Sequence, residues 1–153
     1  MPRISNFEIM NKREQPILFI RTRAKVEDLP MLIGESYGKI EDYLNKLGEY
    51  LSEVPYVAYY NMDMQNLDIE IGFPVCKALA GTDEIQAGFI PAGKVVFCMY
   101  RGAYHEMSET YDEMSKWVEE NNYKPIGMVY EHYYNGPGFP ESEMLTMIVM
   151  PLS

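Results

Sequence analysis

The hydrophobic pattern alternates between short β-type runs and two helical stripes. Residues 16–23 (PILFIRTR) combine β-branched and aromatic side chains, which predicts a strand. Residues 56–62 and 67–73 predict two more strands, joined by a polar turn. Between the first and second of these three strands we expect a helix from about Pro30 to Ser52, because apolar residues recur there every three or four positions and therefore share one helical face. These residues are Ile33, Tyr37, Ile40, Leu44, Leu47 and Leu51.

The second half of the chain repeats this order. Residues 94–101 (KVVFCMYR) align without gaps on residues 16–23 and share the phenylalanine and the final arginine. A second apolar stripe follows at one constant offset from the first, and two further strands are predicted at residues 127–135 and 144–150. The stripe consists of Tyr104, Met107, Tyr111, Met114 and Val118.

Internal similarity of this kind indicates a duplication. We therefore predict an α+β fold in a single domain, residues 1–153, built from a tandem βαββ duplication with pseudo-two-fold symmetry. Repeat one covers about residues 1–80 and repeat two about residues 81–153. The antiparallel sheet would carry two helices that flank a central groove, and ligand pockets favour such junctions.

One acidic residue interrupts an aromatic strand of the second half. Side chains alternate along a strand, so Val129, Glu131 and Tyr133 share a face. If that face is buried, the carboxylate needs a hydrogen bond, a cation or a proton; if it is exposed, Glu131 is solvated and inert. Glu131 aligns with Val57, so the repeated scaffold does not require a carboxylate there. This difference favours a functional role for Glu131.

Charge and composition argue against several classes of function. The net charge of −10 argues against direct nucleic-acid binding and mildly favours cationic ligands. No apolar run approaches the roughly 20 residues of a membrane span, and no signal peptide is evident, so we expect a cytoplasmic protein without membrane contact. Cys76 and Cys98 are predicted to be buried free thiols. His105 and His132 share no ligand spacing with the cysteines, so we predict neither a metal site nor a cofactor.

Four stretches of the sequence carry a resemblance to a known family: residues 101–104 (RGAY), 70–75 (EIGFPV), 131–133 (EHY) and 145–152 (LTMIVMPL). Taken together, they resemble the GyrI-like small-molecule-binding domain, the effector-binding module of AraC-type and MerR-type multidrug regulators. The resemblance spans nearly the whole chain. It implies a fold of two βαββ units, as the repeat predicts independently. Only 15 residues precede the first predicted strand, too few for a DNA-reading module, so a standalone member is expected.

The resemblance also implies a ligand class. The family generally binds bulky, aromatic, often cationic compounds in the central groove, with a late-strand glutamate as the anionic partner. Glu131 matches that glutamate, and Tyr133 matches the family's aromatic residue. The family's second glutamate is replaced here by Met147, which suggests a more apolar pocket.

The main hypothesis is therefore binding or sequestration of lipophilic aromatic cations around a single buried glutamate. Cations gain about 0.5 to 2 kcal/mol over an aromatic ring. The predicted ligand-binding residues are Glu131, Tyr133, Trp117, Tyr104, Tyr37, Tyr60 and Met147. For Trp117 and the tyrosines, a purely structural role in the core is the alternative.

Two other functions stay open. Some standalone members of the family are similar to hydrolases of cyclopropane-containing toxins, which would make Glu131 a general acid or base. The acidic surface could also mimic nucleic acid and inhibit a DNA-binding enzyme. The sequence does not decide whether the protein is an enzyme, or whether it is a monomer or a homodimer.

Overall fold

The computed structural model describes residues 3–136 and 138–153, and it divides into two compact units. The N-terminal unit is Arg13–Ala92, and the C-terminal unit combines Met1–Lys12 with Gly93–Ser153. Each unit contains a run of four antiparallel strands and one α-helix. The predicted α+β class and the repeated strand, helix, strand, strand order are therefore confirmed. The central groove between the helices stays a prediction.

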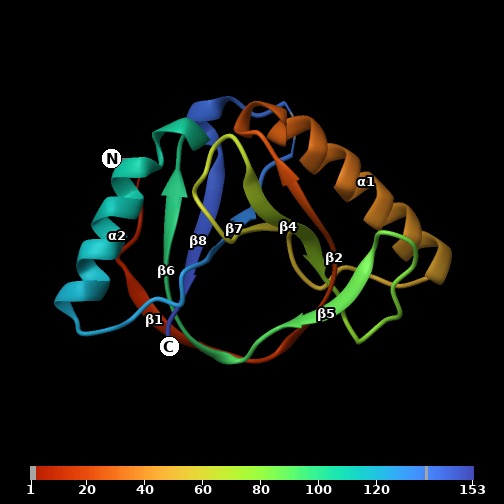
Figure 1. Cartoon of the computed structure of the whole chain (residues 1–153), viewed down its shortest axis with the longest axis horizontal. Helices are drawn as coiled ribbons and strands as arrows, with labels where there is room; N and C mark the ends of the chain where they lie inside the picture. The colour runs from red at the N-terminus through yellow and green to blue at the C-terminus, as the bar shows by residue number, and fades with distance from the viewer. Residues whose placement is uncertain (1–2, 137) are drawn as a thin grey trace. The chain divides into compact units, whose positions relative to one another are not determined.

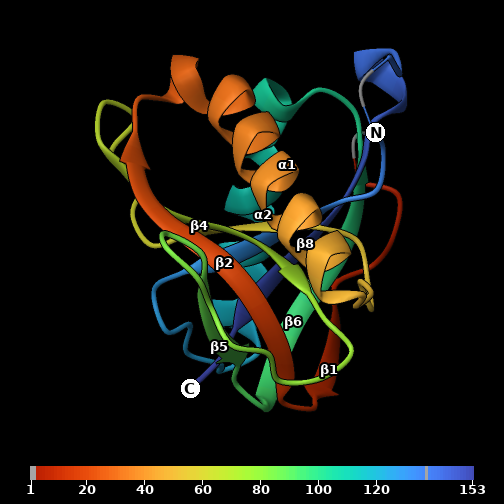
Figure 2. The same ribbon diagram turned by 90° about the vertical axis from the view of Figure 1, so that its right-hand side faces the viewer.

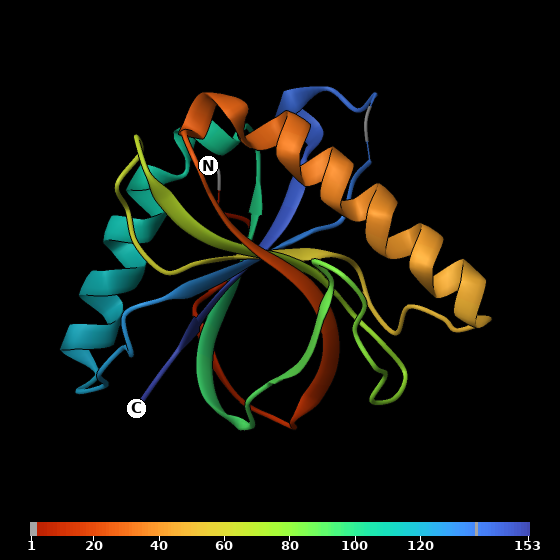
Figure 3. The same cartoon turned by 45° about the vertical axis from the view of Figure 1, so that its right-hand side comes forward.

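The sheet of the N-terminal unit has the order β3-β4-β2-β5. Its longest strand, β2 (Gln15–Ala24), pairs with β4 (Leu67–Pro74) on one side and β5 (Gln86–Ile90) on the other. The short strand β3 (Tyr56–Tyr59) pairs with the far edge of β4. Figure 3 shows β2 curving along its length beside the green strand β5.

Helix α1 (Leu29–Leu47) follows the 3-10 turn Val26–Asp28 and packs on β2 and β4, as Figure 2 shows. It ends earlier than predicted, because Gly48 adopts a left-handed conformation with φ of 69°. Leu47 and Leu51 are consequently exposed rather than part of the buried stripe. The core between helix and sheet contains Leu18, Ile20, Ile40, Leu44, Phe73, Val75 and Ile85.

The sheet of the C-terminal unit has the order β1-β6-β8-β7. Strand β6 (Gly93–Arg101) and strand β8 (Leu145–Pro151) form its centre and lie side by side in Figure 1. Strand β1 (Glu8–Lys12) pairs with β6, and β7 (Val129–Tyr133) pairs with β8. Every pairing is antiparallel.

Helix α2 (Ser108–Glu120) follows the 3-10 turn Tyr104–Glu106. Met107, Met114 and Val118 of the predicted stripe are buried, whereas Tyr104 at the start of the stripe is 46% exposed. A further 3-10 turn, Glu141–Glu143, precedes β8. Helix α2 is shorter than α1, and the part of the predicted apolar stripe that lies on it includes the buried residues Met114 and Val118.

Two features of the fold differ from the expectations. Strand β5 was not predicted, and it occupies beside β2 the place that β1 occupies beside β6. Strand β1 falls within the predicted repeat one but belongs to the C-terminal unit, and β5 falls within the predicted repeat two but belongs to the N-terminal unit. Both cysteines are free thiols, as predicted, but Cys76 is exposed and only Cys98 is buried.

Candidate functional site

Glu131 is the buried acid of the C-terminal unit. It lies in β7 directly opposite Ile148 of β8, and its residue exposure is 7%. The hydroxyl of Tyr133 donates a hydrogen bond of 2.7 Å to Oε1. The hydroxyl of Tyr111, from α2, donates a short hydrogen bond to Oε2. Both carboxylate oxygens are therefore held by phenols, one from the strand and one from the helix.

The local sequence explains this arrangement. Four of the five residues of β7 are buried, so a polar residue in the strand must find its partners inside the protein. Tyr133 lies two residues beyond Glu131 and shares its face. Tyr111 is half-buried on α2, and its hydroxyl reaches the same face of the sheet, where it bonds to the Glu131 carboxylate. Glu131 thus lies on the side of the sheet that α2 covers.

The surroundings of Glu131 disfavour its charge. Burial raises the pKa of the Glu131 carboxyl, and the hydrogen bonds from Tyr111 and Tyr133 oppose this effect only in part. Within the described residues, no Lys, Arg or His side chain forms an ion pair with Glu131. The site therefore holds an acid with neutral donors and without a counter-ion.

Tyr104 links this acid to the surface. Its ring centroid lies 5.1 Å from that of Tyr133, with the planes tilted by 54°. Its hydroxyl approaches the sulfur of Met144 at 4.0 Å. Burial, and in second place the nearby Glu131 carboxylate, raise the pKa of the Tyr104 hydroxyl. Glu131, Tyr133 and Tyr104 form a continuous path from a buried carboxylate to a half-exposed ring, an arrangement suited to an aromatic cation.

Strand β8 places Thr146 on the face of the sheet that carries Glu131, and Met147 on the opposite face. Thr146 lies opposite Tyr133, is fully buried, and its hydroxyl has no hydrogen-bond partner within the described part of the chain. Met147 lies opposite His132 and therefore points to the other face of the sheet. The structure does not bring Met147 to the carboxylate of Glu131.

Trp117 also lies apart from the Glu131 contacts. Its ring stacks on Tyr123, with centroids 6.1 Å apart and planes at 11°, and it contacts Phe7 at 6.2 Å. Arg3 covers the Phe7 ring at 4.2 Å and Lys94 approaches the Tyr123 ring at 5.8 Å. The tryptophan is the middle ring of an aromatic stack that joins α2 to the segment before β1.

Tyr37 and Tyr60 belong to the N-terminal unit. The Tyr37 ring packs on Phe73 with centroids 5.0 Å apart, and its hydroxyl donates a long hydrogen bond of 3.5 Å to the carbonyl of Tyr56. Tyr60 donates a 3.0 Å hydrogen bond to Glu70. A pocket that these tyrosines share with Glu131 stays a prediction.

A second buried glutamate was missed at the sequence level. Glu70 of β4 is 5% exposed, and it accepts hydrogen bonds from Tyr56 at 2.6 Å and Tyr60 at 3.0 Å. Arg21 lies directly opposite it on β2, with its guanidinium 3.8 Å from the Tyr60 ring centroid. The signal was available, because Glu70 interrupts an apolar strand just as Glu131 does.

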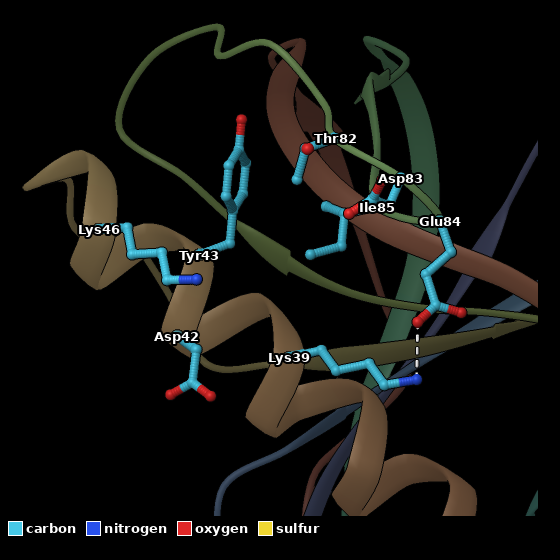
Figure 4. A pocket seen from close by; sticks show the side chains of 8 residues that line it. All are labelled: Lys39, Asp42, Tyr43, Lys46, Thr82, Asp83, Glu84 and Ile85. Atoms are coloured by element: carbon cyan, nitrogen blue, oxygen red, sulfur yellow. Dashed lines mark hydrogen bonds and ion pairs between the residues drawn. The ribbon is translucent and has the colours of Figure 1, made fainter.

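Two hollows of the structure are lined by residues other than these acids. One lies in the N-terminal unit and has a volume of about 250 Å³. Lys39 of α1 and Glu84 form an ion pair across it, as Figure 4 shows, with a length of 2.6 Å. Tyr43, which also lines it, donates a hydrogen bond of 2.7 Å to the Ala80 carbonyl. Another, of about 510 Å³, lies in the C-terminal unit beside the turn at residues 101–106. Its lining includes Arg101 and Glu141.

Two further properties bear on the function. In residues 3–136 and 138–153, no group of three His, Cys, Asp or Glu side chains is arranged to hold a metal ion. In the same part of the chain, neither helix combines the length and apolar character needed to cross a bilayer.

Solved structures share this fold at low sequence identity. The C-terminal domain of EcmrR superposes with a TM-score of 0.79 at 20% identity, covering 98% of both chains. In the EcmrR–DNA complex, 96% of this chain matches 57% of the EcmrR chain, with a TM-score of 0.82 and 20% identity. This chain thus spans little more than half of that regulator.

Two other structures extend the comparison. A hydrolase encoded by lin2189 from Listeria innocua has a TM-score of 0.71 at 16% identity, covering 96% of this chain and 91% of its own. SAV2435 bound to tetraphenylphosphonium has a TM-score of 0.63 at 9% identity, covering 97% and 94%. At these identities the likeness concerns the fold alone.

Sequence comparison identifies the family. No curated protein sequence matches the chain. The GyrI-like small molecule binding domain, in contrast, matches residues 5–153, which is nearly the full length. The chain therefore belongs to the GyrI-like small-molecule-binding domain family.

Proposed function

We propose that this protein binds lipophilic aromatic cations, with Glu131 as the anionic partner. The observation that supports the proposal most directly is the environment of Glu131, a buried carboxylate with two phenol donors and, among the residues that the structure describes, no counter-ion. Burying a carboxylate is costly unless a positive charge compensates it. A ligand that brings both a positive charge and aromatic surface supplies what the site lacks.

The aromatic residues beside the acid support the same ligand class. Tyr133 and Tyr104 offer adjacent ring faces between Glu131 and the solvent. Rings in this position attract cations through their quadrupoles, by about 0.5 to 2 kcal/mol each. Small-molecule binding is the property that names the family, and SAV2435, which shares the fold, was solved with the aromatic cation tetraphenylphosphonium.

Calorimetric titration with tetraphenylphosphonium tests the proposal. Glu131→Gln keeps the size of the side chain and removes the charge, so we expect binding to weaken by at least about tenfold, the loss of a charge-assisted contact worth about 1.4 kcal/mol or more. Glu109→Gln makes the same change of net charge at an exposed position of α2 and should bind as the wild type does. Equal affinity of the wild type and Glu131→Gln contradicts the proposal.

Hydrolysis is a second candidate, because the burial that raises the pKa of Glu131 also suits a general acid or base. The Tyr133 hydroxyl, which donates to Glu131 in this structure, would have to turn to the substrate in order to donate a hydrogen bond to a leaving oxygen. Styrene oxide, a strained aromatic electrophile, is a suitable probe. Formation of its diol by the wild type but not by Glu131→Gln, with binding of a neutral aromatic analogue retained in both, would favour catalysis. Absence of turnover leaves binding as the function.

A further inference from the structure

The two units each bury one glutamate, and the two differ in charge compensation. Both Glu70 and Glu131 accept hydrogen bonds from two tyrosine hydroxyls. Arg21 lies directly across the strand pair from Glu70 and is held there by an ion pair of 2.8 Å with Asp68. The hydrogen bond to Asp68 is the main cause that raises the pKa of the Arg21 guanidinium, and the charge of Glu70 adds a smaller contribution, so Glu70 has a cation in its vicinity. Glu131 has no such neighbour in the described residues. The comparison separates a carboxylate beside a fixed cation from one that lacks a cation.

We propose that Glu131 is a proton-exchange site, which carries a proton in the ligand-free protein and releases it when a permanently charged cation binds. The inference rests on the proposed function and adds how the site is regulated. In the exchange, the carboxyl O–H bond breaks, its electron pair stays on the carboxylate, and the proton passes to water or buffer. The bound cation replaces the proton as the positive charge, so no net charge is created inside the protein.

Among the described residues, the groups that face Glu131 carry no positive charge. Tyr111 approaches from α2, Tyr133 from β7 and Tyr104 from the turn before α2, and all three are phenols. The neighbouring residues on the same face of β6 and β8 are uncharged at neutral pH: Cys98, Tyr100, Thr146 and Ile148.

The cation whose charge reaches this face of the sheet is already paired. Arg3, whose charge reaches Cys98, forms an ion pair with Glu113 of α2 at 3.6 Å. Phenol donors favour the carboxylate, but they are neutral and cannot compensate its charge. A proton is the compensation available to a buried carboxyl group without a cation.

The exchange predicts how affinity depends on pH. Below the pKa of Glu131, a permanent cation must displace the proton, so its affinity should rise about tenfold for each pH unit and level off above that pKa. A neutral aromatic molecule of similar shape, such as triphenylphosphine oxide, displaces no proton and should lack this rise. The site would thus select between charged and neutral ligands according to pH.

Two measurements on the full chain test the inference. The first is carbon-13 NMR of the glutamate carboxyl groups of the ligand-free protein, in which the Glu131 signal is identified by its absence from Glu131→Gln. We expect this carboxyl to titrate above the ordinary glutamate value of 4.5. Titration of Glu131 at or below that value overturns the exchange, whatever the ligand does.

The second is calorimetry of tetraphenylphosphonium binding in two buffers of different ionisation enthalpy, from pH 5.5 to pH 8. The wild type and Glu109→Gln should release about one proton below the Glu131 pKa, and Glu131→Gln none. Binding without proton release, and with the same affinity at every pH, overturns the exchange and leaves the proposed function intact. No binding at any pH overturns the proposed function, and the exchange with it.

Discussion

Tyr111 of α2 and Glu131 of β7 are joined by a hydrogen bond in which the phenol donates to the buried carboxylate. Tyr111→Phe removes this donor, so that Oε2 of the buried Glu131 side chain loses its hydrogen bond from Tyr111. We expect the free energy of unfolding to fall by about 1 to 3 kcal/mol, measured by urea denaturation at neutral pH. Tyr50→Phe changes a tyrosine that is 75% exposed and serves as the control, with an effect within about 0.5 kcal/mol. Equal losses in both variants would contradict a stabilising role for Tyr111.

Titration of Glu131 should make the free energy of unfolding depend on pH, at and above the range in which a glutamate ordinarily titrates. Its pKa in the folded protein is raised above the ordinary value of 4.5, so the folded state holds the proton more tightly than the unfolded state. Stability from this group is fully present below pH 4.5 and is lost as the pH rises through the raised pKa. Glu131→Gln should lack this loss. Urea denaturation of both proteins between pH 4.5 and pH 8 measures it, and parallel curves would argue against a raised pKa.

His132 makes stability depend on pH in the opposite sense. Burial, with a smaller contribution from Lys12, lowers the pKa of its imidazole from 6.5 to about 4. The unfolded chain therefore binds the proton more readily, and stability falls as the pH decreases from 6.5 to about 4, by on the order of 3 kcal/mol from this group. His132→Asn should reduce that slope, whereas His105→Asn, at an exposed imidazole, should keep it. An unchanged slope in His132→Asn would refute the assignment.

Gly72 provides the space that the Glu70 hydrogen bonds need. A Cβ at this position would lie 2.7 Å from the Leu18 carbonyl oxygen and 2.8 Å from the Tyr56 hydroxyl. We expect Gly72→Ala to destabilise the protein by about 1 to 3 kcal/mol through overpacking. Gly34→Ala, in α1, meets no atom within 4 Å and should stabilise by about 0.5 to 1 kcal/mol. Thermal denaturation compares the two, and a neutral Gly72→Ala would contradict the tight approach.

The two cysteines should differ in reactivity. Cys76 is exposed, whereas Cys98 is buried and its burial raises the pKa of the thiol to about 11. A thiol reagent such as Ellman's reagent should modify one group rapidly in the native protein and two after unfolding. Cys76→Ser should abolish the rapid phase, and a rapid phase that survives this change would place the reactive thiol at Cys98.

Periodicity predicted most of the fold because burial imposes it. The stripe that includes Ile40 and Leu44 marked a buried helix face correctly, and the gapless match of residues 16–23 with 94–101 identified two equivalent strands. The end of α1 was placed too late, since the apolar spacing continues beyond Gly48 although the backbone there turns left-handed. Strand β5 was missed because its sequence, QAGFI, contains a glycine and lacks alternation.

The sequence predicted the neighbours of Glu131 only within its own strand, where the alternation of side chains decides which residues share a face. Glu131 and Tyr133 share a face by alternation alone, and a hydrogen bond joins them. Tyr111 was assigned to the buried stripe of α2, but its hydroxyl bond to Glu131 depends on how the helix packs on the sheet. Met147 was assigned to the site by its alignment with a family position, and strand register places it on the opposite face. Trp117 has an aromatic partner, Phe7, that is remote in the sequence.

The two buried acids occupy non-equivalent positions of the duplication: Glu131 aligns with Val57, and Glu70 with Met147. Glu131 also has both of its hydrogen-bond donors inside its own unit. The residues that bind the carboxyl group are thus encoded in one copy of the ancestral repeat. Under the proposed function, substitutions there would change ligand preference over evolutionary time without compensating changes in the other copy, which would remain free to be selected for folding.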